Sequence, residues 1–330
     1  MSIITVKNIT KTFKVSKRNS GIKNAIKAFF KREYDVINAV DNISFTINKG
    51  DLVGYIGPNG AGKSTTIKML SGILEPTSGT IKVNGFNPTK DRIKYVATIG
   101  VVFGQRSQLS WDIPAEDTFD LLKDIYKIDN DKYQKTKEHL TSILSIKEIM
   151  KKPVRSLSLG ERMRCEICAA LLHKPKILFL DEPTIGLDAY SKKVVRDFIK
   201  KINEEEKVTI ILTTHDMTDI ETLAKRIILI GHGKVLYDGK LKQLKTKYGS
   251  FKEIKLTTND KITLDQKGII NISKILNGYK IIFDSNYITT SNIINDLTKK
   301  YNISDIEIEN ENIDSVILKL YEDFKIWKHI

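Results

Sequence analysis

The sequence has no apolar run long enough to cross a bilayer, although 41% of its 330 residues are hydrophobic. A membrane-spanning helix needs about 20 consecutive apolar residues. The chain start, MSIITVKNIT, also lacks the basic cap, apolar stretch and small-residue cleavage site of a secretory signal. We therefore expect a protein that stays in the cytoplasm and does not itself span a membrane.

Cysteine is almost absent: the only two are Cys165 and Cys168, in the spacing C-x-x-C. That spacing occurs in redox pairs and in half of a zinc site. Here both cysteines lie in ERMRCEICAALLHK, a helical pattern in which residues three apart share one face, and no second pair of ligands accompanies them. We interpret them as core residues of a helix rather than as a redox or metal site.

Acidic residues are fewer than basic ones, 40 against 54, which gives a formal net charge of +14. A charge of this size favours anionic partners such as nucleic acid, anionic lipid or phosphate groups, and does not choose among them. A soluble protein that acts on RNA is therefore one of the open alternatives.

Residues 57–64 read GPNGAGKS and match the pattern G-x-x-x-x-G-K-[ST]. An apolar strand pattern precedes them and helical spacing follows in residues 64–70, which is the context of a phosphate-binding loop. Glycine lets backbone N–H groups wrap phosphate oxygens at the start of a helix. Lys63 would pair with the β- and γ-phosphates and the Ser64 hydroxyl would bind Mg²⁺; a glycine-rich turn is the alternative. The residues expected to contact the nucleotide are Gly57, Pro58, Asn59, Gly60, Ala61, Gly62, Lys63, Ser64 and Thr65.

Residues 177–182 read ILFLDE, four apolar residues followed by two carboxylates. The pattern predicts a buried strand that delivers its acids at the carboxyl end. We expect Asp181 to hold Mg²⁺ through water and Glu182 to polarise the attacking water as a general base. Because side chains alternate along a strand, the two carboxylates are predicted to point in opposite directions. The alternative is an acid pair that caps a turn, since Pro183 follows.

The rest of the chain predicts two domains. Apolar runs at 177–180, 208–212 and 226–230 alternate with helical stretches, which indicates a mostly parallel sheet covered by helices. The strand-poor stretch near residues 106–160 predicts a helical subdomain within residues 1–240. After residue 240, β-branched runs surround one helical pattern, so residues 241–330 are expected to form a small α+β domain whose closing helix is capped by Asn312.

Three further motifs occur in a fixed order with those above. LSLGE at residues 157–161 opens the cysteine-bearing helix, GLD lies at residues 186–188, and TTH ends at His215. In this order the sequence resembles the ABC ATPases over residues 1–240. The resemblance implies an α/β P-loop NTPase cassette, with a RecA-like core and antiparallel β and helical subdomains, that binds ATP and Mg²⁺ and hydrolyses ATP.

The resemblance also implies a head-to-tail dimer, in which LSLGE of one subunit completes the ATP site of a second copy or of a homologous ATPase. Ser158 and the N–H of Gly160 would then contact the γ-phosphate, where the partial positive charge of a helix N-terminus favours an anion. Leu159 and Glu161 replace the glycine and glutamine of the family. This difference leaves open how closely the backbone approaches the phosphate and what the fifth position contacts.

Four more positions are assigned by the same resemblance. His215 would contact the γ-phosphate and the opposing loop around Asp188, with a core histidine as the alternative. Phe13 would stack on adenine, which is worth about 1–3 kcal/mol per base; an ordinary strand aromatic is the alternative. In VVFGQRSQL we choose Gln105 over Gln108 as the residue that senses Mg²⁺ and the attacking water.

Among ABC proteins, the sequence most resembles bacterial exporters of drugs, antibiotics or cell-surface polymers. That subfamily pairs its ATPase with a separate permease of several transmembrane helices, so we expect a peripheral subunit on the inner face of the cell membrane. Trp111 would face the permease or pack inside its own lobe, and residues 241–330 would serve pairing or regulation. The alternative is a soluble ABC ATPase that acts on ribosomes or nucleic acid, which the single uninterrupted cassette disfavours.

A basic segment lies between Phe13 and Val36, with no acidic residue before Glu33. Apolar residues recur in it at helical spacing, which predicts an amphipathic insertion over residues 16–34. Such a helix could lie on anionic lipid or on the permease. A helix packed on its own domain with solvated lysines is the equal alternative.

Overall fold

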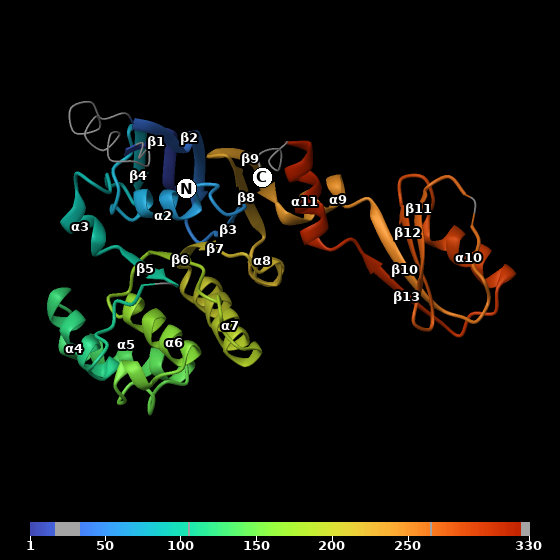
Figure 1. Cartoon of the computed structure of the whole chain (residues 1–330). Helices are drawn as coiled ribbons and strands as arrows, with labels where there is room; N and C mark the ends of the chain where they lie inside the picture. Colours follow the sequence, from blue (N-terminus) through green and yellow to red (C-terminus); the bar gives the residue numbers. More distant parts are fainter. Residues whose placement is uncertain (17–33, 105, 265, 325–330) are drawn as a thin grey trace, which may run out of the picture. The chain divides into compact units, whose positions relative to one another are not determined.

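The computed structural model describes residues 1–16, 34–104, 106–264 and 266–324, and the chain divides into two units, Met1–Asp238 and Gly239–Ile330 (Figure 1). Most of the predicted basic insertion lies outside the described residues, and so does Gln105. Within the described part of the chain, no helix is both long and apolar enough to cross a membrane.

The main sheet of the first unit has six strands in the order β5-β6-β7-β3-β8-β9. Its strands are β3 (Leu52–Ile56), β5 (Ile99–Phe103), β6 (Ile177–Asp181), β7 (Thr209–Thr213), β8 (Arg226–Gly231) and β9 (Lys234–Lys240). The neighbours from β5 to β8 pair in parallel, and every residue of β3 and β7 is buried. Strands covered on both faces need continuous apolar runs. The prediction of a mostly parallel sheet is therefore confirmed.

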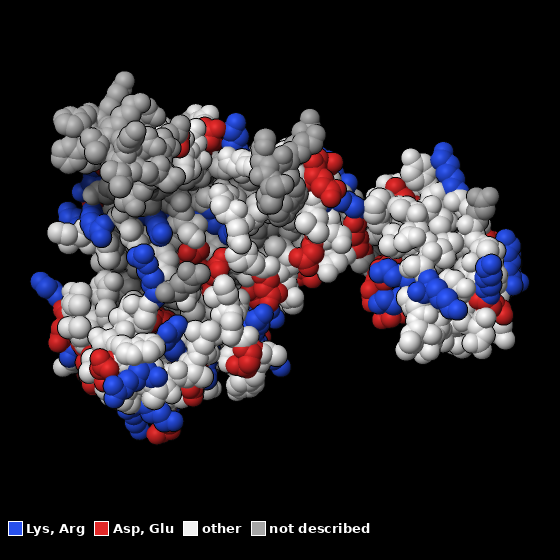
Figure 2. Space-filling model, in the orientation of Figure 1, with Lys and Arg blue, Asp and Glu red and all other residues white. Residues whose placement is uncertain are grey.

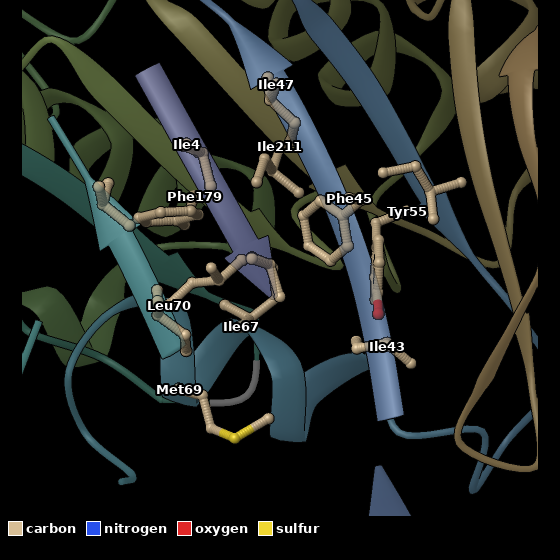
Figure 3. Close-up of a cluster of buried hydrophobic side chains, with 14 of the residues drawn as sticks. Ile4, Ile43, Phe45, Ile47, Tyr55, Ile67, Met69, Leu70, Phe179 and Ile211 are labelled. Carbon is tan, nitrogen blue, oxygen red and sulfur yellow. The ribbon is translucent and has the colours of Figure 1, made fainter. Parts of the chain in front are cut away.

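A second, antiparallel sheet packs beside β3 and the helix that follows it. Its order is β2-β1-β4, with β1 (Ser2–Ser16), β2 (Tyr34–Asn48) and β4 (Ser78–Val83). Figure 3 shows its apolar side chains packed against β3 and against helix α2 (Lys63–Leu70). Phe45 of β2 lies next to Tyr55 of β3, with ring centroids 5.9 Å apart, and Ile67 of α2 belongs to the same cluster. This core holds β3 and α2 on either side of the loop that joins them.

Helices fill the connection between β5 and β6. They are α4 (Ala115–Ile125), α5 (Asn130–Ile143), a short 3₁₀ turn (Val154–Ser156) and α6 (Leu159–Leu171). Arg164 of α6 donates from Nη1 to the carbonyl oxygens of Leu144 and Ser145, 3.0 and 3.3 Å away, at the end of α5. Because α6 also contacts β5, it links the helical lobe to the parallel sheet.

The two cysteines are core residues of α6, as the helical pattern predicted. Both are buried, and burial raises the pKa of the Cys165 thiol to about 12 and that of Cys168 further. A neutral thiol is a poor nucleophile and a poor metal ligand. Among the described residues there is also no cluster of His, Cys, Asp and Glu that could hold a metal ion.

The remaining helices of the first unit are short connections and one long helix. They are α3 (Arg92–Val96), α7 (Ala189–Glu206) and α8 (Met217–Leu223). The long helix α7 begins after the GLD motif, with Asp188 as its N-cap, and packs against α6 and α8. The motif loops after β6 and β7 therefore both lead into helices at the carboxyl edge of the sheet.

The second unit has its own core. It contains α9 (Leu241–Tyr248), β10 (Phe251–Thr257), β11 (Ile269–Ile275), β12 (Gly278–Asp284), α10 (Thr290–Lys300), β13 (Asp305–Asn310) and α11 (Ile313–Asp323). The four strands form an antiparallel sheet in the order β11-β12-β10-β13, and Ile293 and Leu297 of α10 belong to the sheet's apolar cluster. Helices α9 and α11 pack together. Asn312 caps α11 through a bond from the Asp314 N–H, as predicted.

Candidate nucleotide site

The glycine-rich loop joins β3 to α2, and its backbone conformation requires glycine. Gly60 and Gly62 have φ values of +79° and +101°, in the left-handed region that side chains disfavour. A side chain at Gly57 would collide with the Ile230 carbonyl oxygen, and one at Gly62 with that of Ala39. The loop is therefore held close to neighbouring backbone, and residues 57–62 lead from β3 into α2 in the predicted strand-loop-helix order.

Lys63 is the first residue of α2, and its side chain folds back against the loop. It is buried, and its Nζ donates to the carbonyl oxygens of Gly57 at 2.7 Å and Pro58 at 3.1 Å. Burial lowers the pKa of Lys63, while the nearby charges of Glu182 and Asp181 oppose that shift. The ammonium group is thus placed between the loop and the two carboxylates.

Ser64 and Asp181 are the two predicted metal ligands that the structure describes, and a hydrogen bond joins them. The Ser64 hydroxyl donates to Asp181 Oδ1 at 3.3 Å, and the Thr213 hydroxyl donates to the same oxygen at 2.6 Å. Asp181 and Thr213 are partners in the parallel register of β6 and β7, so both lie at the carboxyl edge of the sheet. Thr213 was missed by the sequence reasoning, although it is the first threonine of the TTH motif.

The prediction that Asp181 and Glu182 point in opposite directions is wrong. Strand β6 ends at Asp181, and Glu182 has a φ of 56°. Its N–H donates to the carbonyl and hydroxyl oxygens of Thr213 at 3.0 and 3.1 Å. Because the backbone turns left-handed there, strand alternation no longer sets the direction of the side chain. Both carboxylates line one pocket, together with Ser64 and Arg106.

His215 contacts Glu182 directly, with 2.5 Å between Nε2 and Oε1. Its side chain is 43% exposed, so it is not a core histidine. It follows β7 in the loop that leads to α8, next to the Thr214 hydroxyl that binds the buried carboxylate of Asp219. Within one chain, the histidine predicted to contact the γ-phosphate and the predicted general base therefore form a pair.

Asp219 is a further residue that the sequence reasoning missed. It is fully buried, and its two oxygens accept from the hydroxyls of Thr184 and Thr214 and from Arg196 Nε. These partners come from the loop after β6, the loop after β7 and helix α7. Asp219 thus joins the segments that carry Glu182 and His215.

Ser158 and Glu161 form a reciprocal cap at the start of α6. Ser158 Oγ accepts from the Glu161 N–H at 3.2 Å, and Glu161 Oε2 accepts from the Ser158 N–H at 2.8 Å. The bond from the Ser158 backbone lowers the pKa of the Glu161 carboxyl. The contact of the fifth motif position, which the sequence left open, is therefore this capping box.

LSLGE (residues 157–161), from here on the signature motif, packs on the GLD loop of the same chain. Gly160 is buried, and a side chain there would collide with Ser191. Asp188 accepts from the Ser191 N–H at 2.9 Å and the Ser191 hydroxyl at 2.7 Å, and these bonds lower the pKa of its carboxyl. Leu159 lies against Gly186, which has a φ of +71°. Glycine at positions 160 and 186 thus permits the close contact between the two motifs.

The remaining predicted positions lie at the surface or outside the described residues. Phe13 is half exposed on β1, with Lys11 Nζ 5.5 Å from its ring centroid. Gln105 lies outside the described residues, whereas the side chain of Gln108 donates to the Glu166 carbonyl oxygen of α6 at 2.9 Å. Trp111 is 53% exposed and so is not packed inside its lobe.

Comparison with known proteins places these motifs in one family. The ABC transporter family pattern matches residues 40–185. The ABC transporter ATP-binding protein NatA of Bacillus subtilis is 35% identical over 215 residues, which cover 65% of this chain and 87% of NatA. The linearmycin resistance ATP-binding protein LnrL of Bacillus subtilis is 34% identical, and the bacitracin transport ATP-binding protein BcrA of Bacillus licheniformis is 32% identical. Each of these two matches covers 69% of this chain and 73% of the relative.

Solved structures share the fold. A dimeric structure of the ATP-binding cassette MJ0796, in a post-hydrolysis state bound to ADP and Pi, is 26% identical with a TM-score of 0.60. The match covers 72% of this chain and 98% of that cassette. The cassette fold implied by the motifs is therefore confirmed.

Proposed function

The chain belongs to the ABC transporter family and is an ATP-binding ATPase subunit; we propose that two such subunits, joined head to tail by ATP, drive a separate membrane permease. The observation that carries the proposal is that the predicted phosphate, metal and general-base residues lie together at the carboxyl edge of the sheet. There Lys63 lies in the phosphate loop, Ser64 meets Asp181, and Glu182 contacts His215.

We propose that Ser64 and Asp181 hold Mg²⁺. Hydroxyl and carboxylate oxygens suit this hard cation, and the two already share a hydrogen bond of 3.3 Å. Mg²⁺ would neutralise charge on the γ-phosphate. Glu182 would accept the proton of the attacking water as general base, and His215 would orient the Glu182 carboxylate while its exposed edge meets the γ-phosphate.

The arrangement of the signature motif supports a composite site. Ser158 and Gly160 lie at the N-terminus of α6, which favours an anion. In one chain these residues contact Glu161 and Ser191, and they do not line the pocket that contains Ser64 and Glu182. A second subunit would therefore present its own signature motif to the nucleotide held by this chain. The dimeric state of the related MJ0796 cassette supports the same arrangement.

We propose that the transported cargo is an antibiotic or a related amphiphile moving outward. Two relatives are named for linearmycin resistance and bacitracin transport. The permease would dock on the helical lobe at the exposed side chains of Trp111 and Ile113, which keeps this subunit at the cytoplasmic face of the membrane. The lipid contact predicted for residues 16–34 lies outside the described residues and stays a prediction.

The test is to purify tagged Glu182→Gln protein from detergent-solubilised host membranes and to identify what stays bound by mass spectrometry. We expect a hydrophobic, multi-spanning protein in near-equal amount, and an untagged strain provides the control. Recovery of ribosomes or DNA with no membrane protein would refute the transport role and favour the soluble ABC class.

A further inference from the structure

A cavity of about 600 Å³, from here on the basal cavity, lies in the first unit at the amino edge of the main sheet. Its lining includes Lys176 and Val208, which immediately precede β6 and β7, together with residues of α5 and the carboxyl ends of α6 and α7. Strand β6 runs from Lys176 to its end at Asp181, and five residues of extended strand span about 17 Å. The basal cavity is therefore separate from the nucleotide site at the carboxyl edge.

Five exposed lysines surround the basal cavity. They are Lys49, Lys135, Lys174, Lys176 and Lys207. In the described part of the chain none of the five forms an ion pair, whereas Lys137 of α5 pairs with Glu116 at 2.6 Å. Among the described lining residues Glu206 carries the one carboxylate, and its Oε1 lies 3.4 Å from His139 Nε2. The rim of the cavity thus has an excess of positive charge that this carboxylate does not balance.

Helix ends account for only part of this rim. Lys174 and Lys207 follow the carboxyl ends of α6 and α7, where the partial negative charge of a helix favours a cation. Lys49 lies in the turn between β2 and β3, Lys135 lies inside α5, and Lys176 precedes a strand. Like charges gathered around one cavity repel one another, and a bound anion removes that repulsion. The rim therefore favours an anionic ligand.

The floor of the basal cavity is aliphatic. Leu140 of α5, Leu171 of α6, Ile202 of α7 and Val208 line it, and all four are buried. None of the described lining residues is Phe, Tyr or Trp, the side chains on which a nucleotide base stacks. An aliphatic group placed on this floor is removed from water, which favours binding. The floor therefore suits an alkyl chain better than a base.

The kind of cation on the rim indicates the head group. Lysine binds phosphate as a point charge, whereas planar, bidentate recognition of a carboxylate relies on arginine. The described lining residues include no arginine. We propose that the basal cavity binds an aliphatic phosphate monoester, with the phosphate among the rim lysines and the chain over Leu140 and Ile202. This is a second ligand site, and its argument uses no step of the proposed ATP cycle.

The test is isothermal titration of the full chain with octyl phosphate below its micelle concentration. Saturating ADP and Mg²⁺ keep the phosphate loop occupied. We expect binding of octyl phosphate, and hexyl phosphate should bind about tenfold more weakly because it buries two fewer CH₂ groups. Inorganic phosphate, which has no chain, should bind more weakly still. Absence of octyl phosphate binding, or equal affinity for the two alkyl phosphates, would overturn the proposal.

Two charge-matched variants place the ligand on the chain. Lys135→Gln with Lys176→Gln removes two rim charges and should weaken octyl phosphate binding at least about tenfold. The control, Lys132→Gln with Lys200→Gln, removes two exposed charges of α5 and α7 outside the cavity and should bind within about twofold of the wild type. Urea unfolding should show the three proteins equally stable. An equal loss of binding in both double variants would show that overall charge attracts the ligand, and would overturn the proposal.

Competition with nucleotide separates the two sites. A tenfold increase in ADP above saturation should leave the affinity for octyl phosphate unchanged, because the sites lie at opposite edges of the sheet. Displacement of octyl phosphate by ADP would place it in the phosphate loop and overturn the proposal. Failure of Glu182→Gln to dimerise with ATP would contradict the proposed function and would leave the titration results for the basal cavity valid.

Discussion

The two units of the chain differ in the polar side chains that they bury. The unit Met1–Asp238 buries charged residues that include Lys63, Glu166 and Asp219. Among the described residues of Gly239–Ile330 no charged residue is buried as a whole, although the Glu311 side chain is only 7% exposed and pairs with Lys319. A buried charge must be compensated by specific partners. The buried charges of the first unit therefore mark where the chain maintains costly geometry: Lys63 and Asp219 lie at the nucleotide site, and Lys137 and Arg164 lie in the helical lobe.

The charged pairs on the sheet of the second unit are partly exposed. On one face of its sheet, Lys255 contacts Glu309 at 2.7 Å and Lys280 contacts Glu253 at 2.5 Å, across three neighbouring strands. Figure 2 shows Lys and Arg interspersed with Asp and Glu on the visible surface of both units. Exposed pairs of this kind contribute little to stability. The comparison assigns the ATP chemistry to the first unit and leaves pairing or regulation as the proposed role of the second.

The largest effect is expected from removing the buried lysine of the phosphate loop. Lys63→Ala should weaken ATP binding by about 100-fold or more, because the variant loses a charge-assisted contact to the phosphates. Isothermal titration with ATP and Mg²⁺ measures the change. Lys255→Ala in the second unit is the matched control and should bind ATP as the wild type does. Equal ATP affinity in the two variants would contradict the assignment of nucleotide binding to the first unit.

A smaller loss is expected where the two motifs pack together. Gly160→Ala places a methyl group against Ser191 and should destabilise the first unit by about 1–3 kcal/mol, with lower ATP turnover. Urea unfolding and steady-state kinetics measure the two effects. Adding Ser191→Gly should recover part of the stability by restoring space. A fully stable Gly160→Ala variant would show that this contact is not close.

The capping box of the signature helix should have an intermediate effect that depends on pH. Glu161→Ala should cost about 0.5–2 kcal/mol, and Glu161→Gln should cost less because glutamine also forms a capping box. The folded-state pKa of Glu161 lies below its ordinary value of 4.5, so its charge stabilises the fold at neutral pH and this contribution is lost as pH falls through the folded-state pKa. The stability difference between wild type and Glu161→Gln should therefore shrink on acidification. A difference that grows at low pH would be inconsistent with this assignment.

The smallest effect is expected in the surface ladder of the second unit. Lys255→Ala removes contacts with Glu309, Glu307 and Glu253, and like-charge repulsion among these carboxylates should weaken the sheet slightly. Turnover of ATP by this variant should stay within about twofold of the wild type. Thermal unfolding and ATPase assays measure both. A large loss of turnover would show that the second unit contributes directly to the chemistry.

Local motifs made much of the nucleotide site predictable. Glycine spacing, the lysine at a helix start and an apolar strand ending in Asp181 each follow from physics that acts over a few neighbouring residues. The direction of Glu182 was not predictable, because it depends on a left-handed turn that Thr213 of the neighbouring strand stabilises. Asp219 and Glu166 were missed for a related reason. Thr184 and Arg196, which bind Asp219, and Gln108, which binds Glu166, lie 35, 23 and 58 residues away in the sequence and meet them only after the chain has packed.

The central claim is that two chains share ATP between the phosphate loop of one and the signature motif of the other. The most direct measurement is the molar mass of purified Glu182→Gln protein by size-exclusion chromatography with light scattering, in ATP and Mg²⁺ and separately in ADP. Removing the general base should leave ATP bound and uncleaved, so we predict a dimer with ATP and a monomer with ADP. A protein that binds ATP, as shown by titration, and yet remains a monomer would contradict the account.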